Sequence, residues 1–395
     1  MKKFKYFFIP ILGIVIFGFI FNSYINKKYD SLIKTKDITS IKHTYNQIVR
    51  DRGGVLKDKM RDDGDLMIFG SSEFSSPVNQ NPINMFPNNY ANYDVSIYGR
   101  AYTQSIQHAS ILANISNLNK DDKVAIVMSE QWFENSWGID GSNFAVNFSE
   151  QQFYNYFNND KIDKENKIYY AQRVAKLLKE SGEFNEERIY ANLYYRDNLV
   201  SKAVLTLLKP YYSFKENMLA IKDKVQSIKI LESLDDKEEK EVKNINWNEE
   251  FEIAEKEAKS KVSNNDIYVD DEYYDMYIRE NYDSLKDSRK DLDLMVSKEM
   301  EDYQLLLNTC ENLEIKPLII LMPVNGLYYD HLGLGVEKRT EFYNKIEEMA
   351  EEKGFDVLNL QNKEYEKYYM YDVMHLGWKG WLTINEEMSK YFQGK

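Results

Sequence analysis

Two short segments near opposite ends of the chain carry the residue types of an activated serine. Gly70-Ser71-Ser72-Glu73 directly follows an apolar run, and Asp372-Val373-Met374-His375 lies close to the carboxyl end. A serine hydroxyl is a weak nucleophile until an imidazole accepts its proton and a carboxylate orients that imidazole. The two segments therefore supply the groups needed for acyl chemistry through a covalent ester.

The elements that must position these residues are strands of one sheet. Five short apolar runs have the length and β-branched content of buried strands, and helical patterns lie between them. This alternation predicts an α/β fold with a doubly wound, five-stranded parallel sheet flanked by helices. The carboxyl ends of parallel strands meet at one edge, where such sheets bind ligands, so Ser72 and His375 are expected there together. The predicted strands are Leu66–Phe69, Val95–Ile97, Val124–Met128, Leu318–Met322 and Phe355–Leu360.

Both segments also have ordinary structural interpretations. A Gly-Ser-Ser sequence often forms a polar turn, and Ser71 or Ser72 can cap a helix through its hydroxyl. An aspartate three residues before a histidine is common in loops, where the two side chains make a local hydrogen bond. It is the combination of the two segments at one sheet edge that favours catalysis.

Four further residues after predicted strands are candidates for the site. Gly99 follows the second strand, where its N–H can approach an oxyanion closely, and Gln131 offers an amide donor after the third. His331 lies in a loop after the fourth strand and can contact a substrate. Trp378 follows the last strand, where it can line the crevice or pack in the core. A purely structural role stays open for each of them.

The chain is interrupted by a region that does not follow the strand and helix rhythm. Between about residues 147 and 297 the sequence is rich in charged residues and tyrosine and shows mainly amphipathic helix patterns. We expect a helical insertion within a catalytic domain of residues 61–395, with its charge runs on solvated helix faces. Residues 29–60 are predicted to form a helical stalk that precedes this domain.

The amino-terminal segment has the pattern of a membrane anchor. Residues 6–21 are uncharged and have lysines on both sides. This stretch is slightly shorter than the roughly 20 residues of a usual span. A cleaved signal peptide shares the basic start and apolar middle, but no small-x-small cleavage pattern follows Phe21. We therefore expect an uncleaved transmembrane helix within residues 1–28, a cytoplasmic amino end and an extracellular catalytic domain at the cell membrane.

Composition argues against several other functions. The formal net charge of −13 argues against nucleic acid, whose phosphates require a basic surface. Four scattered histidines and one cysteine show no zinc-ligand spacing, so neither a metal nor another cofactor is expected. The single cysteine, Cys310, lies in a helical pattern and is expected to be a small buried hydrophobe.

The order of these segments resembles the SGNH hydrolase superfamily, with a serine after the first strand, a glycine loop, an amide loop and a final Asp-x-x-His. More closely, the chain over nearly its full length resembles the DltD family of D-alanyl transfer proteins of Gram-positive bacteria. The features that carry this resemblance are the amino-terminal anchor, Phe69-Gly70-Ser71-Ser72-Glu73, Ser129-Glu130-Gln131-Trp132-Phe133, Asn325-Gly326-Leu327-Tyr328-Tyr329-Asp330-His331, and the segment from Asp372 to Trp381.

The resemblance implies roles for individual residues. Ser72 rather than Ser71 matches the serine of the superfamily's Gly-Asp-Ser motif, which makes Ser72 the nucleophile. His375 is implied as its base and Asp372 as the carboxylate that orients the imidazole. The superfamily's Gly-x-Asn-Asp motif is absent, so Gln131 is only a substitute for the asparagine in an oxyanion hole.

The resemblance also implies a function in D-alanylation of teichoic acid. A D-alanyl ester would form on Ser72 and pass to a hydroxyl of lipoteichoic or wall teichoic acid outside the cell. The implied partners are a D-alanyl carrier protein upstream, a multipass membrane O-acyltransferase and the teichoic acid acceptor. An esterase or deacylase of cell-surface polymer is the nearest alternative, and a non-catalytic anchored scaffold of the D-alanylation machinery is another.

Overall fold

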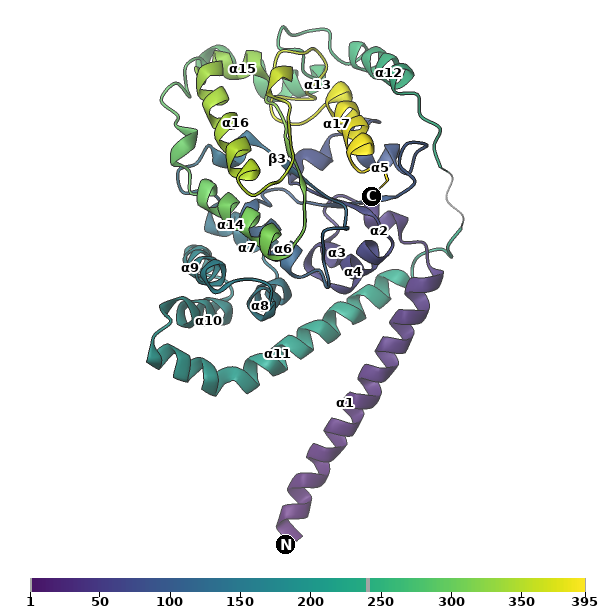
Figure 1. Ribbon diagram of the computed structural model, residues 1–395, viewed down its shortest axis with the longest axis vertical. Helices are drawn as coiled ribbons and strands as arrows, with labels where there is room; N and C mark the ends of the chain where they lie inside the picture. Colours follow the sequence, from purple (N-terminus) through teal and green to yellow (C-terminus); the bar gives the residue numbers. More distant parts are fainter. Residues whose placement is uncertain (1, 239–241, 395) are drawn as a thin grey trace.

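A five-stranded parallel sheet forms the centre of the protein (Figure 1). The computed structural model describes residues 2–238 and 242–394, with side chains from residue 12 onward except those of residues 14 and 15. The strand order is β2-β1-β3-β4-β5, and every neighbouring pair is parallel. The predicted α/β class and parallel sheet are therefore confirmed. The strands are β1 (Leu66–Phe69), β2 (Val95–Tyr98), β3 (Val124–Met128), β4 (Leu318–Leu321) and β5 (Val357–Asn359).

Helices precede, connect and cover the strands. Before β3 lie α1 (Lys2–Thr35), α2 (Thr39–His43), α3 (Ile48–Arg52), α4 (Val55–Asp62), α5 (Pro82–Met85) and α6 (Ser105–Ala113). Between β3 and β4 lie α7 (Gly141–Asn147), α8 (Glu150–Asn158), α9 (Lys164–Ser181), α10 (Asn185–Arg196), α11 (Leu199–Leu231), α12 (Trp247–Lys259), α13 (Asp271–Tyr273) and α14 (Glu299–Asn312). After β4 come α15 (Gly326–His331), α16 (Val336–Glu351) and α17 (Trp378–Tyr391).

The structure also contains short 3₁₀ and π-helical turns. Two of them directly follow strands at the carboxyl edge of the sheet, namely η1 (Ser72–Ser75) after β1 and η2 (Glu130–Phe133) after β3. The others are the π-helical η3 (Tyr274–Ile278) and the 3₁₀ turns η4 (Asp283–Leu285), η5 (Leu294–Val296) and η6 (Gln361–Lys363).

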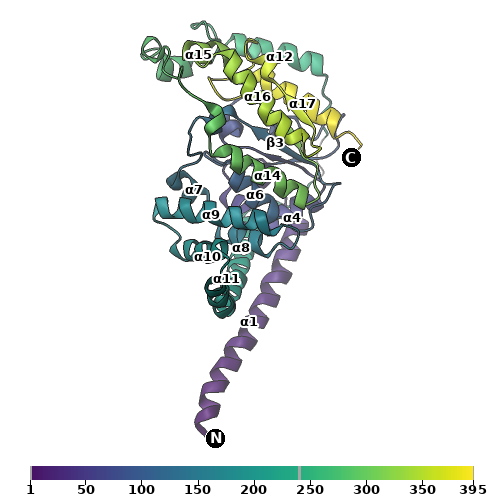
Figure 2. The same cartoon turned by 60° about the vertical axis from the view of Figure 1, so that its left-hand side comes forward.

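Alternate side chains of the strands pack into two separate cores, one on each face of the sheet. Met67 and Ile126 lie in a core shared with α6, α14 and α16, whereas Ile68 and Val127 lie in a core shared with α12 and α17. Figures 1 and 2 show these helices on opposite sides of the strands. Because β1 to β4 are buried on both faces, their sequences are apolar apart from the buried Ser96 of β2.

The segment between β3 and β4 is helical, and it contains no strand in the parts of residues 129–317 that the structure describes. Its helices α8, α9 and α10 pack through aromatic side chains, for example Phe153, Tyr170 and Tyr190. The ends of α9 are typical, since the Asp163 side chain accepts a hydrogen bond from the Asn166 N–H and a left-handed glycine follows. The core position expected for Cys310, in α14, is confirmed.

Residues 29–60, expected as a stalk, form part of the body. The segment is helical in parts, but Ile41 and Met60 are buried in the core on one face of the sheet. The Tyr29 hydroxyl donates a hydrogen bond to the Val55 carbonyl at 2.8 Å, which ties α1 to α4. The apolar side chains of this segment are thus buried, and the segment packs against the sheet domain.

Helix α1 projects from one end of the body (Figure 1). Among the described residues, no helix combines the length and the apolar character needed to cross a membrane. The anchor predicted within residues 1–28 falls partly outside this description, because Met1 and the side chains of residues 2–11, 14 and 15 are not described. The anchor therefore stays a prediction.

Candidate active site

The predicted serine, histidine and aspartate lie together at the carboxyl edge of the sheet. The hydroxyl oxygen of Ser72 is 2.9 Å from Nε2 of His375. Nδ1 of the same imidazole is 2.7 Å from Oδ2 of Asp372. Because a carboxylate can only accept, the imidazole proton sits on Nδ1 and leaves Nε2 free to accept the hydroxyl proton. The arrangement is that of a hydroxyl, a base and a group that orients the base.

Close approach of two glycines places Ser72 at the end of β1. Gly70 follows β1, and its N–H donates to the carbonyl of Tyr98 at the end of β2. A Cβ atom on Gly99 would lie only 2.6 Å from the Gly70 carbonyl oxygen. A larger residue at position 99 would therefore push the ends of β1 and β2 apart. The neighbouring Ser71 turns its hydroxyl to the Arg100 carbonyl at 3.0 Å. Of the two serines, it is therefore Ser72 whose hydroxyl faces the imidazole.

A tight loop before α17 presents the other two side chains. Oδ1 of Asp372 accepts hydrogen bonds from the N–H groups of Met374 and His375, at 2.8 and 2.7 Å. The loop closes where the Tyr371 N–H donates to the His375 carbonyl. One aspartate thus shapes the backbone of the loop with one oxygen and orients the imidazole with the other.

The loop that carries Ser72 and the loop that carries His375 are joined to each other. The Ser76 hydroxyl, at the end of η1, donates a buried hydrogen bond of 2.7 Å to the carbonyl of Leu376. Ser76 and Leu376 come from segments far apart in the chain. This bond therefore holds the serine loop and the histidine loop in register.

The helical insertion also supports the site. The Asp270 N–H donates to the carbonyl of Tyr371 at 2.9 Å, in the loop that carries Asp372. The Asn325 side chain, after β4, donates to the Ile267 carbonyl at 2.7 Å, and its N–H donates to that loop as well. Sequence reasoning assigned no role to these insertion residues. Nothing in their spacing signals the contact, which exists only because the chain folds back.

The local electrostatics favour a charged imidazole. Burial by itself lowers the pKa of His375, but the hydrogen bond and the charge of Asp372, with a smaller effect of Glu73, raise it above its ordinary value. Glu73 is completely buried and accepts a hydrogen bond from the Ser71 N–H. Burial raises the pKa of Glu73, while the nearby His375 opposes that increase.

Glu73 is the neighbour of the serine that sequence analysis left without a role. Its position in the Gly-Ser-Ser-Glu segment was the available signal, because a carboxylate next to a turn serine can reach the same imidazole. Its burial is what makes the charge effective, since a low-dielectric surrounding strengthens the interaction with His375.

The predicted oxyanion residues differ in how close the structure brings them to Ser72. Gly99 lies beside the serine loop, where a Cβ at this position would meet the Gly70 backbone and the ring of Phe74. Gln131 lies half-buried in η2, after β3. The role of both as hydrogen-bond donors to an oxyanion stays a prediction.

The two predicted substrate-contact residues are held by other contacts. Nε2 of His331 lies 2.6 Å from the Tyr282 carbonyl, and its ring stacks on the Tyr282 ring with centroids 3.9 Å apart. Trp378 is buried at the start of α17, with its ring centroid 5.7 Å from that of Tyr371. Both side chains thus have structural contacts, and a role in substrate contact stays a prediction for each.

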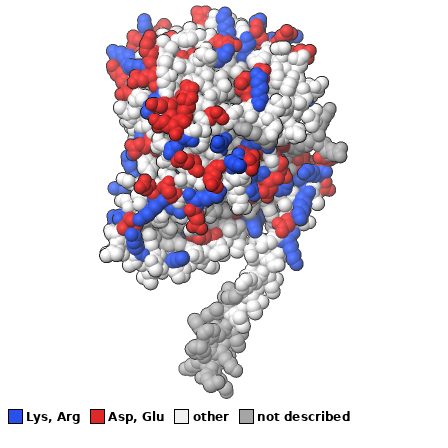
Figure 3. Space-filling view, in the orientation of Figure 1, with Lys and Arg blue, Asp and Glu red and all other residues white. Residues whose placement is uncertain are grey.

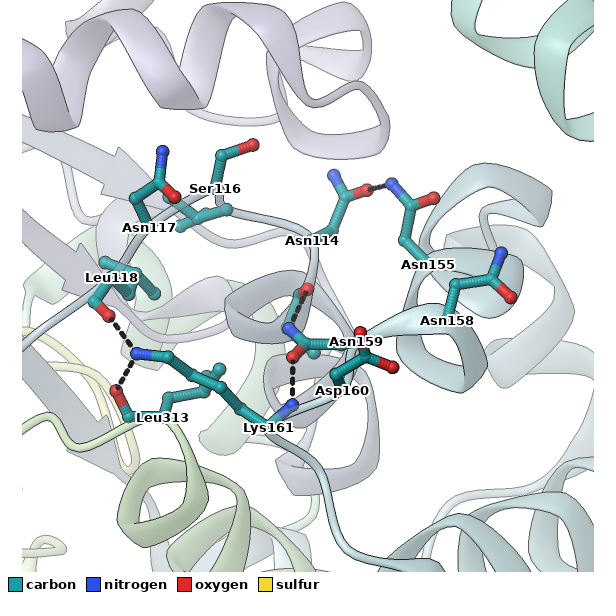
Figure 4. A pocket seen from close by; sticks show the side chains of 12 residues that line it. Asn114, Ser116, Asn117, Leu118, Asn155, Asn158, Asn159, Asp160, Lys161 and Leu313 are labelled. Atoms are coloured by element: carbon teal, nitrogen blue, oxygen red, sulfur yellow. Dashed lines mark hydrogen bonds between the residues drawn. The ribbon is translucent and has the colours of Figure 1, made fainter.

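Several hollows in the described part of the chain lie away from Ser72. One, of about 380 Å³, is lined by asparagines between α6 and α8. Figure 4 shows that its polar groups bond to one another, as the Asn155 amide does to Asn114. It lies where α6 returns to β3, at the amino ends of the strands, opposite the edge that carries Ser72. Among the described residues, no group of three or more potential ligands is placed to hold a metal ion.

A second hollow, of about 830 Å³, is basic. It lies between α9, α10 and the start of α14. In the described part of the chain, Lys179 and Arg196 have no carboxylate partner, whereas Arg173 is paired with Asp302. We call this feature the basic hollow, and its cationic side chains are Arg173, Lys176, Lys179, Arg188, Arg196 and Lys298.

Comparison with known proteins decides the family. A family model described as DltD protein matches residues 42–393, which is most of the chain and includes the loops that carry Ser72 and His375. The chain belongs to the DltD family. The resemblance drawn from the motifs is thereby confirmed, and the DltD family is involved in the D-alanylation of teichoic acids.

Individual members of the DltD family match along most of their length. Protein DltD of Bacillus subtilis (strain 168) is 29% identical over 87% of this chain and 86% of its own length. Protein DltD of Staphylococcus aureus (strain NCTC 8325 / PS 47) is 28% identical over 98% of this chain and 96% of its own. Protein DltD of Lacticaseibacillus rhamnosus is 22% identical over 87% and 81%, respectively.

Proposed function

We propose that this chain is a membrane-anchored, extracellular D-alanyl transferase that carries D-alanine as an ester on Ser72. The observation that carries the proposal is the hydrogen-bonded series from Ser72 through His375 to Asp372, with distances of 2.9 and 2.7 Å. Membership of the DltD family supports D-alanine as the acyl group and teichoic acid as the acceptor. The series supplies a way to make and break an ester at one hydroxyl.

In the first half-reaction, Nε2 of His375 accepts the Ser72 hydroxyl proton while the oxygen attacks the carbonyl carbon of an activated D-alanyl group. The bond from that carbon to the donor then breaks, and His375 returns the proton to the leaving group. The product is a D-alanyl ester on Ser72. Asp372 holds the imidazole and stabilises its charged form, and N–H groups at Gly99 or Gln131 would stabilise the oxyanion.

In the second half-reaction, a hydroxyl of teichoic acid takes the place of the donor. His375 accepts its proton, the hydroxyl oxygen attacks the ester carbonyl, and the bond to Ser72 breaks as the proton returns to the serine. Water in place of the polymer hydroxyl would give hydrolysis. Transfer therefore requires that the acceptor reaches the ester faster than water does.

The proposed location follows from the amino-terminal segment. Residues 6–21 are uncharged between lysines, and we propose that this part of α1 anchors the chain in the cell membrane with the domain outside. The upstream partners are then a D-alanyl carrier protein and a multipass membrane O-acyltransferase, which deliver the acyl group at the same membrane. Shared tethering raises the effective concentration of donor and acceptor near Ser72.

The acceptor presents an electrostatic problem, because teichoic acid is a polyanion and this chain has a net charge of −13. We propose that the basic hollow holds part of the acceptor's phosphodiester chain. Two of its residues contact the loop that follows η2, since the Lys298 N–H donates to the Ser136 carbonyl and Arg173 donates to the carbonyl of Trp137. A local concentration of cations can attract a polyanion that the molecule as a whole repels.

The test is to find and follow the acyl group. The full-length protein, reconstituted with its membrane and carrier partners, ATP and labelled D-alanine, is analysed by intact mass and peptide mapping. We expect a D-alanyl adduct on Ser72 that is chased onto added teichoic acid. His375→Ala should abolish the adduct, and Asp372→Asn should slow its formation by about 10⁴-fold, because the imidazole loses its orientation and correct tautomer.

Ser75→Ala is the matched control, since it removes an exposed hydroxyl from the same turn that donates only to the Ser72 carbonyl. It should keep the adduct. If Ser72→Ala transfers D-alanine to teichoic acid at the normal rate, the chain is a scaffold and the proposal is wrong. An adduct released only to water, with teichoic acid present, would instead assign the chain as an esterase.

A further inference from the structure

Helix α11 exposes a row of large apolar side chains along its amino-terminal part. The three most exposed are Leu199, Leu207 and Val200, with 87%, 80% and 73% of their surface accessible. Large apolar side chains clustered on one surface mark a site where another apolar body binds. The row consists of Leu199, Val200, Leu207, Tyr211, Phe214 and Met218, and we call it the α11 row.

The spacing of the α11 row places it on one face of the helix. Successive members are one, three, four or seven residues apart, which corresponds to a single stripe at 3.6 residues per turn. The opposite face of α11 packs against the body of the protein. There the ring of Tyr212 lies on those of Tyr190 and Tyr154, with centroid distances of 4.7 and 5.9 Å. A helix that is apolar around most of its circumference is stable only when both faces are covered.

The place of α11 in the molecule indicates what covers the outer face. In Figures 1 and 2, α11 forms the end of the body from which α1 projects. Figure 3 shows few charged side chains along this lower edge of the body. The carboxyl-terminal part of α11 is tied to α1, since Lys224 donates to the Asn26 side chain at 2.6 Å and Lys28 pairs with Glu232. The proposed anchor therefore brings the membrane to the α11 side.

We propose that the segment 199–218 of α11 lies in the interface of the membrane, with the α11 row buried among the outer headgroups and acyl chains. The exposed Lys222 lies one turn after Met218 on the same side of the helix, where it meets anionic headgroups. This inference rests on the proposed anchoring by α1. Two attachments, α1 and α11, restrict rotation of the body about α1 and so keep Ser72 in one orientation relative to the membrane.

The test uses a fluorophore at single positions of the full-length chain. The native Cys310 is fully buried and burial raises the pKa of its thiol, so an introduced cysteine is labelled selectively. Leu207→Cys reports on the α11 row and Phe17→Cys on the anchor. Glu252→Cys is the matched control, since it is an exposed helical position on α12, which lies at the other end of the body in Figures 1 and 2.

Each labelled protein is reconstituted in vesicles of phosphatidylcholine and phosphatidylglycerol. We expect lipids carrying a quencher near the headgroup to quench the label at position 207, and aqueous iodide to quench it several-fold less than the label at position 252. Phe214→Glu in the same protein should restore quenching by iodide at position 207, because a charge in the row opposes its burial.

Three results are distinguishable. If the label at position 17 is quenched by lipid while that at position 207 is open to iodide like the control, the inference about α11 is wrong and the anchor stands. If the label at position 17 is itself not quenched by lipid, the anchoring has failed and the inference falls with it. A label at position 207 that neither quencher reaches would show that a second copy of the chain covers the row, which also overturns the proposal.

Discussion

At the scale of single residues, the site depends on which way adjacent side chains point. Ser71 and Ser72 are neighbours of the same type, but one hydroxyl donates to the Arg100 carbonyl and the other lies 2.9 Å from Nε2 of His375. The division of work is similar in Asp372, whose two oxygens serve the backbone and the imidazole. A shift of either loop by about 1 Å would break this geometry, and such shifts are costly for catalysis.

Acyl-enzyme formation should depend on pH through His375. The imidazole acts as a base only when neutral, and its pKa is raised by Asp372 and Glu73, so the rate should fall as the pH is lowered through a midpoint above 6.5. Glu73→Gln keeps an acceptor for the Ser71 N–H but removes the charge. It should therefore move the midpoint to lower pH, measured as the rate of D-alanyl adduct formation against pH. Glu249→Gln, an exposed position on α12, is the control, and an unshifted midpoint in Glu73→Gln would contradict this account.

The same pKa shift has a consequence for stability. Because the pKa of His375 is higher in the folded protein than in the unfolded chain, the interaction stabilises the fold fully below the unfolded value and is lost as the pH rises through the folded value. Asp372→Asn should thus reduce the free energy of unfolding more at pH 6 than at pH 9, as measured by urea unfolding. An equal loss at both pH values would show that the charge pair is not the cause.

Gly99→Ala should lower both stability and acylation. The added Cβ would lie 2.6 Å from the backbone carbonyl oxygen of Gly70, and the backbone fixes the position of a Cβ, so the ends of β1 and β2 must separate. We expect a loss of about 1–3 kcal/mol in urea unfolding and a slower adduct formation on Ser72. Gly335→Ala is the control, because its Cβ would meet only the flexible end of Glu337. Normal acylation in Gly99→Ala would show that the close approach does not position Ser72.

At the scale of elements, the helical insertion braces the sheet through buried charges. Arg173 of α9 donates to both oxygens of Asp302 in α14 and to the carbonyl of Trp137, in the loop after η2. Glu299, one turn before Asp302, is also completely buried, and burial and the charge of Asp302 raise its pKa to about 8. One arginine thus holds together α9, α14 and the loop that follows β3.

Arg173→Ala should destabilise the protein strongly. Removal of one partner leaves Asp302 buried without its counter-charge, which typically costs about 3–5 kcal/mol. The measurement is urea unfolding at neutral pH, with Lys176→Ala, an exposed cation of the same helix, as the control. Because protonation relieves an unpaired carboxylate, the loss should be smaller at pH 5 than at pH 8. A loss below 1 kcal/mol would mean that water or another group replaces the guanidinium.

At the scale of the whole molecule, charge is distributed unevenly. The chain has a net charge of −13, yet Lys179 and Arg196 in the basic hollow have no carboxylate partner among the described residues. The outer face of α11 is apolar instead. The proposed functions of these surfaces differ accordingly, since one would attract a phosphodiester chain and the other would bind lipid.

Charge reversal in the basic hollow should separate the two half-reactions. Lys179→Glu combined with Arg196→Glu should slow the chase of D-alanine from Ser72 onto teichoic acid by about 3- to 10-fold, because exposed charge interactions are individually weak. Adduct formation on Ser72 should be unchanged. Lys256→Glu combined with Lys316→Glu changes the net charge equally at exposed sites elsewhere. An equal effect of both pairs would assign the result to net charge and not to the hollow.

Much of the fold was predictable because it is encoded locally. Strands buried on both faces are mainly apolar, so β1 to β4 are recognisable within one residue of their ends, whereas the half-buried β5 is shorter than the predicted strand. Contacts between distant segments were not predictable in this way. The support of the Asp372 loop by Asp270 and the packing of residues 29–60 on the sheet are of this kind.

The amino-acid sequence by itself determined the parallel sheet, the family and the three residues that meet at its edge, because hydrophobic period and motif order are properties of neighbouring residues. Only the tertiary structure decided that Ser72 faces His375, that Glu73 is buried beside it, and that α11 keeps an apolar face exposed. Each of these depends on which surfaces the folded chain brings together, and burial is a property of that arrangement and not of the residue.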